Sequence, residues 1–304
     1  MTFTSNGENV TIFRQYDRAG LDREYDNAAK VSVEMLKSYR ASWAETSRRA
    51  RETIPCDLDL AYGPSPGERL DIFRPGQIGP APVQIYIHGG YWISNDKSDC
   101  SYVALGFVGA GYVTVVINYA LIPAVGMAEQ VRQCRAAIRR IAENIHRYGA
   151  DPEHIYVTGH SAGGHLAVML LTDPELPSGH VKGITSLSGL YDLKPVQLSF
   201  VNEKLGLSET DVTELSPVLL QPRLTTPRLL LTIGRDEGEE YIRQMNDLAA
   251  AWRRFMPHLT AVIIPGTNHF SMRAALVDAD SDISRLIRRE MEQSDRSEED
   301  RLSR

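Results

Sequence analysis

The chain has 304 residues, of which 42% are hydrophobic and 24% charged, and its formal net charge is −6. This length allows one large α/β domain or two small ones. The mildly acidic balance gives no general electrostatic attraction to nucleic acid or anionic membranes. No apolar run approaches the roughly 20 residues that span a bilayer. We therefore expect a protein that acts on a small molecule, with no nucleic-acid or membrane partner.

The three cysteines, Cys56, Cys100 and Cys134, form no CxxC pair and no cluster with metal-ligand spacing. A sparse, odd count is typical of a reducing compartment. The first eight residues lack the basic start and apolar core of a signal peptide. The sequence therefore predicts a cytoplasmic protein without a bound metal ion.

The N-terminal part of the chain, residues 1–55, is polar and its pattern predicts helices. Two runs that follow, 57–60 and 70–73, alternate apolar and polar side chains, as edge strands do. The segment 63–67 between them is made of glycine, proline and serine, which favour turns. These two runs are predicted to form an antiparallel hairpin.

Short apolar runs then alternate with segments of helical length. Strands are predicted at 83–87, 113–117, 155–158, 183–188, 228–233 and 259–264. A helix is predicted over 127–147, where apolar side chains recur at alternating steps of four and three. This alternation predicts an α/β fold with a mostly parallel, doubly wound sheet and helices on both faces.

The same pattern divides the chain into three parts. Residues 1–55 form a helical segment that we expect to contribute to a lid, and residues 56–290 form the α/β domain. Within that domain the long segment 191–226 contains prolines and interrupts the alternation, which predicts a small lid-like insertion over the site. Residues 291–304 are almost wholly charged and polar, and we expect a frayed helix end or a disordered tail.

The segment 159–163 reads Gly-His-Ser-Ala-Gly and lies between a predicted strand and a predicted helix. A serine at such a sharp turn stands clear of the sheet and within reach of a base. Gly159 and Gly163 lack the side chains that would clash in so tight a turn. An ordinary turn serine would not explain this context, so we predict that Ser161 is a nucleophile.

A second motif, His-Gly-Gly-Tyr-Trp at 88–92, ends the strand predicted at 83–87. Two adjacent glycines let the backbone turn and expose N–H groups, which can bind the negative charge of a transition state. We predict that the amides of Gly90, Tyr91 and Ala162 form this oxyanion hole. His88 is expected to brace the loop rather than to transfer protons.

An acid and a base follow later strands. Asp236 comes after the strand at 228–233, and His269 comes after the strand at 259–264. The carboxyl ends of parallel strands meet at one rim of the sheet, where ligands bind. We predict a triad of Ser161, Asp236 and His269, with Glu237 as the alternative acid.

The candidate substrate pocket is built from residues beside these motifs: Gly89, Trp92, His165 and Phe270. Phe200 and Met272 could also contribute to an apolar pocket, but core packing is the favoured interpretation for both.

Taken together, these motifs resemble the kynurenine formamidase (arylformamidase) group, in the hormone-sensitive-lipase-like branch of the α/β-hydrolases. The resemblance covers roughly residues 20–290 and includes the segments 21–27, 70–73, 96–99 and 118–121 outside the site. The His-Gly-Gly-x-Trp element is specific, since other branches usually carry a third glycine. Many members have an acidic residue where this chain has Asn268, which leaves the exact substrate open.

The resemblance implies an α/β-hydrolase fold and hydrolysis of N-formyl-L-kynurenine or a related aryl formamide, with no cofactor and no metal ion. Relatives are often dimers, so a homodimer is one expected state. A short-chain carboxylesterase, or a hydrolase of a xenobiotic amide, carbamate or ester, is the alternative function. A non-catalytic binding protein with this fold is less favoured, because all three triad residue types are present.

Overall fold

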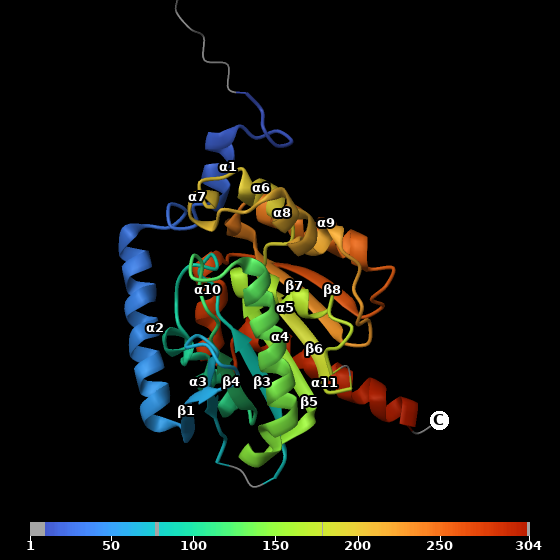
Figure 1. The fold of residues 1–304 in the computed structure, drawn as a ribbon. Coiled ribbons are helices and arrows are strands. Elements are labelled where there is room, and N and C mark those ends of the chain that lie inside the picture. The colour runs from blue at the N-terminus through green and yellow to red at the C-terminus, as the bar shows by residue number, and fades with distance from the viewer. Residues whose placement is uncertain (1–9, 77–78, 178, 303–304) are drawn as a thin grey trace, which may run out of the picture.

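The computed structural model describes residues 10–76, 79–177 and 179–302. Its strands are β1 (Cys56–Ala61), β2 (Arg69–Phe73), β3 (Ala81–Ile87), β4 (Val113–Ile117), β5 (Ala150–His160), β6 (Val181–Leu187), β7 (Arg228–Gly234) and β8 (Leu259–Ile264). In this part of the chain they form one eight-stranded sheet in the order β1-β2-β4-β3-β5-β6-β7-β8 (Figure 1). β2 is antiparallel to β1 and β4, and the other pairs are parallel. The mostly parallel sheet and the antiparallel hairpin predicted from the sequence are confirmed.

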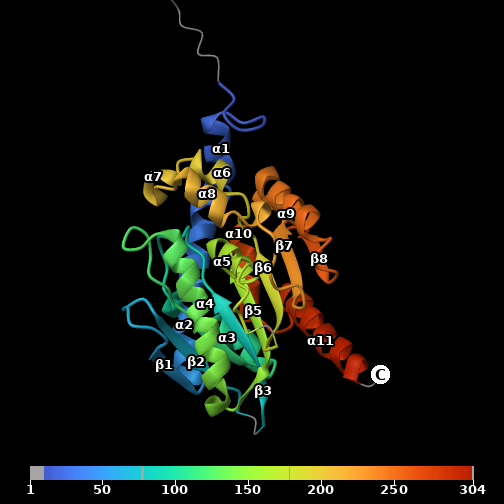
Figure 2. The same ribbon diagram turned by 45° about the vertical axis from the view of Figure 1, so that its right-hand side comes forward.

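The described helices are α1 (Arg18–Tyr25), α2 (Val33–Thr53), α3 (Val103–Gly109), α4 (Met127–Asn144), α5 (Ala162–Leu170), α6 (Leu193–Gln197), α7 (Asn202–Leu205), α8 (Glu209–Leu215), α9 (Glu239–Trp252), α10 (His269–Ala274) and α11 (Asp282–Leu302). The longer helices cover both faces of the sheet (Figures 1 and 2). The predicted helix over 127–147 is observed as α4, followed by a 3-10 turn at Ile145–Tyr148.

The sheet separates two hydrophobic cores. In β3, Ile85 and Ile87 belong to the core that contains buried side chains of α4, α5 and α9. Tyr86 between them points to the opposite core, which contains side chains of α3, α10 and α11. This alternation follows from the two-residue period of a strand. β4 reads Val-Thr-Val-Val-Ile and is buried throughout, because helices cover both of its faces.

Short helices gather beyond the carboxyl ends of the strands. α1 lies beside α6, α7 and α8 at the end of the molecule opposite to α11 (Figures 1 and 2). Arg18 of α1 forms an ion pair with Glu203 of α7 at 2.7 Å, and the Asp22 carboxylate accepts a hydrogen bond from the Phe200 amide at 2.7 Å. The N-terminal segment and residues 191–226 are therefore joined here, and their action as a lid stays a prediction.

The C-terminal helix α11 continues through residues 291–302, where a frayed helix end or a disordered tail was expected, and residues 303–304 lie outside the described part. Ile283, Ile287 and Met291 are buried and anchor its first half. Extending a formed helix costs far less than starting one, and the glutamates and arginines that follow are good helix formers. Among the described helices, none is long and apolar enough to cross a membrane.

Candidate active site

Ser161 lies at the turn that joins β5 to α5. Its backbone has φ 57° and ψ −121°, a strained conformation for a residue with a side chain. The flanking glycines are sterically required. A Cβ on Gly159 would lie 2.0 Å from the Gly163 carbonyl oxygen, and a Cβ on Gly163 would lie 2.1 Å from the Ile87 carbonyl oxygen. The sequence therefore folds into the sharp strand–turn–helix that its pattern predicts.

The loop after β3 lies directly beside this turn, because β3 and β5 are neighbours and Ile87 pairs with Gly159. A Cβ on Gly89 would lie only 3.0 Å from the Ser161 Cβ. Three consecutive residues, 90–92, have positive φ values of 115°, 48° and 60°. This unusual backbone is the kind of strain that gathers at functional sites.

The amides of Gly90, Tyr91 and Ala162 were predicted to form the oxyanion hole. In the described part of the chain, the amides of Gly90 and Tyr91 donate to no carbonyl group. Ala162 is the first residue of α5, and no side chain caps that helix end. Their role as oxyanion donors stays a prediction.

The acid that meets His269 is Glu237. Nδ1 of His269 lies 2.6 Å from Oε2 of Glu237, whose side chain is fully buried. The other carboxylate oxygen accepts hydrogen bonds from the Gly234 amide at 2.7 Å and the Ser188 hydroxyl at 2.6 Å. Both oxygens are therefore satisfied, and the carboxylate is fixed against the imidazole.

The prediction of Asp236 as the triad acid is wrong, since its side chain is exposed to solvent. β7 ends at Gly234, and Arg235–Glu237 form one turn of 3-10 helix. With three residues per turn, adjacent side chains point roughly 120° apart. Asp236 therefore points outward and Glu237 points toward the histidine.

His269 begins α10, where the Asn268 side chain caps the helix by accepting from the amides of Phe270 and Ser271 at 2.9 and 3.0 Å. Nε2 of His160 donates to the His269 carbonyl at 2.9 Å, and the two rings are 4.6 Å apart. Since His160 precedes Ser161, this bond ties the histidine loop to the nucleophile turn. Burial, aided by the positive potential of His269, lowers the pKa of His160 well below its usual value.

A pocket of about 530 Å³ lies over these residues, and Ser161 and His269 both line it. Much of its wall is aromatic and comes from distant parts of the chain: Tyr25, Trp43, Tyr91, Phe200 and Phe270. Phe270 was predicted to line the pocket. Phe200 was expected in the core, but its side chain is 38% exposed and it lines the pocket instead.

Three predicted pocket residues lie behind the catalytic surface instead. Trp92 and His165 are fully buried, and Gly89 is buried against the nucleophile turn. Nε1 of Trp92 donates to Nδ1 of His165 at 3.2 Å, and Nε2 of His165 donates to the Leu215 carbonyl at 2.8 Å. These contacts brace the loop after β3 against α5. Burial lowers the pKa of His165 to about 4.

The other two expectations near the motifs agree with the structure. His88 is fully buried, stacks on Tyr119 at 4.4 Å between ring centroids, and contacts Oδ1 of Asn118 at 3.0 Å. It therefore braces the loop, as expected. Met272 is fully buried in the core.

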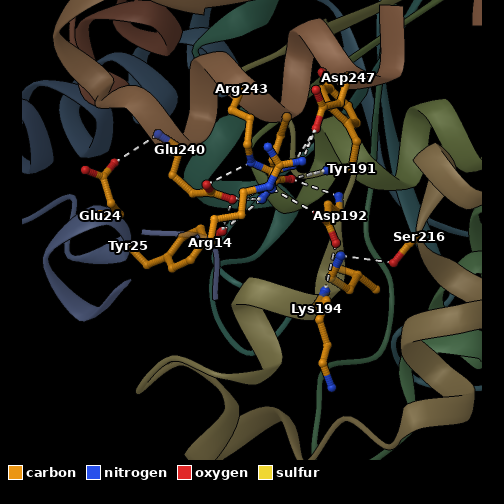
Figure 3. A network of polar contacts seen from close by, with 12 residues as sticks. Arg14, Glu24, Tyr25, Tyr191, Asp192, Lys194, Ser216, Glu240, Arg243 and Asp247 are labelled. Atoms are coloured by element: carbon orange, nitrogen blue, oxygen red, sulfur yellow. Dashed lines mark hydrogen bonds and ion pairs between the residues drawn. The ribbon is translucent and has the colours of Figure 1, made fainter. Parts of the chain in front are cut away.

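The pocket wall is tied to α9 by a buried network of polar side chains (Figure 3). The Tyr25 hydroxyl donates to Glu240 at 3.2 Å and accepts from Nε2 of Gln244 at 2.8 Å. Arg243 forms ion pairs with Glu240 and, at 2.9 Å, with Asp192 at the start of α6. The network therefore fixes the N-terminal segment and the 191–226 segment to the same helix.

A second set of contacts holds the loop after β3. Asn27 donates to the hydroxyls of Tyr241 at 2.8 Å and Tyr91 at 3.2 Å, and those hydroxyls are 3.1 Å apart. Lys30 donates to the backbone carbonyl of Glu237. Residues 25–30 thus reach both the predicted oxyanion loop and the acid. In the ranges that the structure describes, no group of three or more His, Cys, Asp or Glu could hold a metal ion.

Comparison with known proteins identifies the family. The family model described as BD-FAE matches residues 70–204. A kynurenine formamidase of Salmo salar is 32% identical over 270 residues, which cover 86% of this chain and 90% of the relative. This chain belongs to the kynurenine formamidase family. The resemblance predicted from the sequence is therefore confirmed.

Two further proteins are similar to this chain, one in structure and one in sequence. A candidate thioesterase from Silicibacter sp. TM1040, known from a crystal structure, is 30% identical to this chain, with a TM-score of 0.78. The match covers 88% of this chain and 98% of that one. Esterase LipQ of Mycobacterium tuberculosis is 36% identical over 149 residues, 44% of this chain and 35% of that one. The chain is a hydrolase with the α/β-hydrolase fold, as predicted.

Proposed function

We propose that this member of the family is a serine hydrolase that cleaves N-formyl-L-kynurenine or a closely related aryl formamide through an acyl-enzyme. One observation carries the proposal. The imidazole of His269 is held at 2.6 Å by the buried Glu237 carboxylate and lines the same pocket as Ser161. The similarity to the kynurenine formamidase of Salmo salar over most of both chains supports the choice of substrate.

In the first half of the reaction, the Ser161 hydroxyl oxygen attacks the formyl carbon while His269 takes the hydroxyl proton. Glu237 fixes the tautomer of His269 and stabilises the imidazolium that forms. The amides of Gly90, Tyr91 and Ala162 bind the negative charge on the carbonyl oxygen. The carbon–nitrogen bond then breaks, and His269 gives its proton to the departing aryl amine.

In the second half, a water molecule loses its proton to His269 as its oxygen attacks the formyl-enzyme. The ester bond to Ser161 breaks, the serine recovers its proton and formate leaves. No further group is needed to balance these two steps.

The pocket supports an aromatic substrate. Trp43 and Phe270 have ring centroids 6.2 Å apart, and Phe270 meets His269 edge to face at 5.9 Å. An aryl ring beside the formamide would find aromatic contacts in this wall.

Kinetics on two substrates test the proposal. We expect kcat/KM for N-formyl-L-kynurenine to exceed that for p-nitrophenyl acetate by at least tenfold. The partial match to the Mycobacterium tuberculosis esterase favours a short-chain carboxylesterase as the second candidate. Rapid ester cleavage with negligible formamide cleavage would establish that alternative. No labelling of Ser161 by a fluorophosphonate, in a folded sample, would point to a non-catalytic protein.

We also propose a cytoplasmic location. The described cysteines Cys56, Cys100 and Cys134 are all free, which supports a reducing compartment.

A further inference from the structure

Arg273 is a charged residue of the pocket that the mechanism above does not use. It follows His269 by one turn on α10, so both side chains share one face of that helix. Only 7% of Arg273 is exposed. Its guanidinium carbon stands 3.7 Å from the centroid of the Trp43 indole and 5.7 Å from that of the Tyr102 ring. The guanidinium is thus held in place by aromatic rings.

This buried charge has no counterion among the described residues. Two other poorly exposed arginines, Arg228 and Arg243, each pair with a carboxylate at 2.9 Å. No described carboxylate lies within 4.0 Å of Arg273, and its Nε has no hydrogen-bond partner. A buried charge without a counterion is costly, and the contacts with Trp43 and Tyr102 offset only part of that cost. The remaining cost is the kind that a negatively charged ligand would remove.

Arg273 lines the same pocket as Ser161 and His269. It also contributes, after burial and His269, to lowering the pKa of His160, so its positive charge is felt beside the nucleophile turn. The two carboxylates in the pocket wall are held elsewhere. Asp26 accepts from the Ala29 amide at 3.1 Å, and Asp99 accepts from the Asp96 amide at 3.0 Å.

We propose that Arg273 is a specificity residue of this pocket: it binds a carboxylate of the substrate and gives the site its preference for a negatively charged aryl formamide over a neutral analogue. The proposal rests on the function proposed above and adds a specificity residue to it. A guanidinium offers two parallel N–H groups to a carboxylate in one plane. The stacked Trp43 ring keeps that plane fixed, while the aryl ring of the substrate lies toward Phe270 and the formamide toward Ser161.

A matched pair of substrates tests this assignment: 4-(2-formamidophenyl)-4-oxobutanoic acid and its neutral primary amide. For the natural chain we expect at least a tenfold higher kcat/KM for the acid, mainly through a lower KM. In Arg273→Gln we expect the acid-to-amide ratio of kcat/KM to fall about tenfold or more, toward 1, since a charge-assisted pair is lost. Arg273→Lys is expected to keep part of the preference, because lysine keeps the positive charge but lacks the two parallel N–H groups of the guanidinium.

Arg49→Gln is the control for a change in net charge. Arg49 is exposed on the same helix as Trp43, outside the pocket, and we expect this variant to keep both the activity and the acid-to-amide ratio. An equal loss on both substrates in Arg273→Gln would make Arg273 a structural residue and overturn the proposal. Equal kcat/KM values in the natural chain would overturn it without any variant.

Inhibition separates this test from the test of the proposed function. The carboxylate 4-oxo-4-phenylbutanoate and its primary amide carry no formamide group, and either can be measured as an inhibitor of p-nitrophenyl acetate hydrolysis. Tighter inhibition by the carboxylate, lost in Arg273→Gln, supports the anion site even if no formamide is cleaved. Equal inhibition by the two compounds contradicts the site, whatever the substrate proves to be.

Discussion

Different interactions position the two parts of the pocket, which we call the catalytic floor and the roof. The floor consists of Ser161, Glu237 and His269 with the loops that carry them, all at the ends of parallel strands. The roof consists of residues 18–53 and 191–226, and it is fixed by side-chain hydrogen bonds and ion pairs. The reacting groups therefore belong to the floor, whereas Tyr25, Trp43 and Phe200 of the aromatic wall belong to the roof.

The largest effect is expected from removing the nucleophile of the floor. Ser161→Ala should lower kcat by about 10⁴–10⁶-fold, because the attacking oxygen is absent. The fold should remain, since alanine keeps the Cβ and removes only the hydroxyl. Steady-state kinetics and circular dichroism measure the two effects, and fluorophosphonate labelling should vanish. Activity near that of the natural chain would refute the assignment.

The acid of the floor can be identified with a matched pair of variants. Glu237→Gln should lower kcat by about 10³–10⁴-fold, because an amide cannot hold the required tautomer of His269. Asp236→Asn, one residue away and exposed, should change kcat less than threefold. The same kinetic assay compares them. A larger loss in Asp236→Asn would restore the acid that the sequence favoured.

A substitution in the roof should lower the free energy of unfolding, with a smaller effect on the rate of the chemical step. Arg243→Met leaves the fully buried Glu240 without its ion pair, and we expect the free energy of unfolding to fall by about 3–5 kcal/mol. In the variant that still folds, KM should rise more than kcat falls. The control is Arg285→Met, whose pair with Asp282 is exposed and should matter by less than about 1 kcal/mol. Urea unfolding measures both, and equal effects would contradict the distinction.

Lowering the pH should reduce the free energy of unfolding by a smaller amount, through protonation of the buried histidines that support the floor. Burial lowers the pKa of His165 from an ordinary value of 6.5 to about 4, so the folded chain favours the neutral ring. Its contribution to stability is complete above pH 6.5 and is lost as the pH falls toward 4. Burial lowers the pKa of His88 and His160 in the same direction. Urea unfolding between pH 7 and 4 should show this loss, with a shallower slope in His165→Gln; an unchanged slope would contradict it.

The sequence predicts most of the floor correctly, because the turns and strands that carry its residues require particular residue types. Glycine is required at positions 159 and 163, because a Cβ at either would lie close to 2 Å from a backbone carbonyl oxygen. The strands can be recognised from their apolar runs. Glu237 was predicted only as the alternative to Asp236, for a specific reason. A single 3-10 turn decides whether residue 236 or 237 points inward, and the composition of Arg-Asp-Glu does not reveal that rotation.

The roof could not be predicted in the same way. Tyr25 meets Glu240 across 215 positions, and Asn27 meets Tyr241 across 214 positions. Such pairs leave no periodicity or spacing in the chain, so Tyr25 and Asn27 were not recognised as pocket residues. Trp92 and His165 were wrongly predicted to line the pocket, because they lie next to the motifs in sequence. That proximity does not show on which side of the backbone a ring lies.

The spread of the site along the chain, from Tyr25 to Arg273, has a consequence for biosynthesis. A growing polypeptide that has been translated through the 3-10 turn after β7 already contains the nucleophile Ser161 and the acid Glu237, yet it still lacks the base His269. No substrate can therefore be turned over until the chain has been synthesised through His269. Premature termination after β8 would therefore yield an inert protein that still carries the eight described strands.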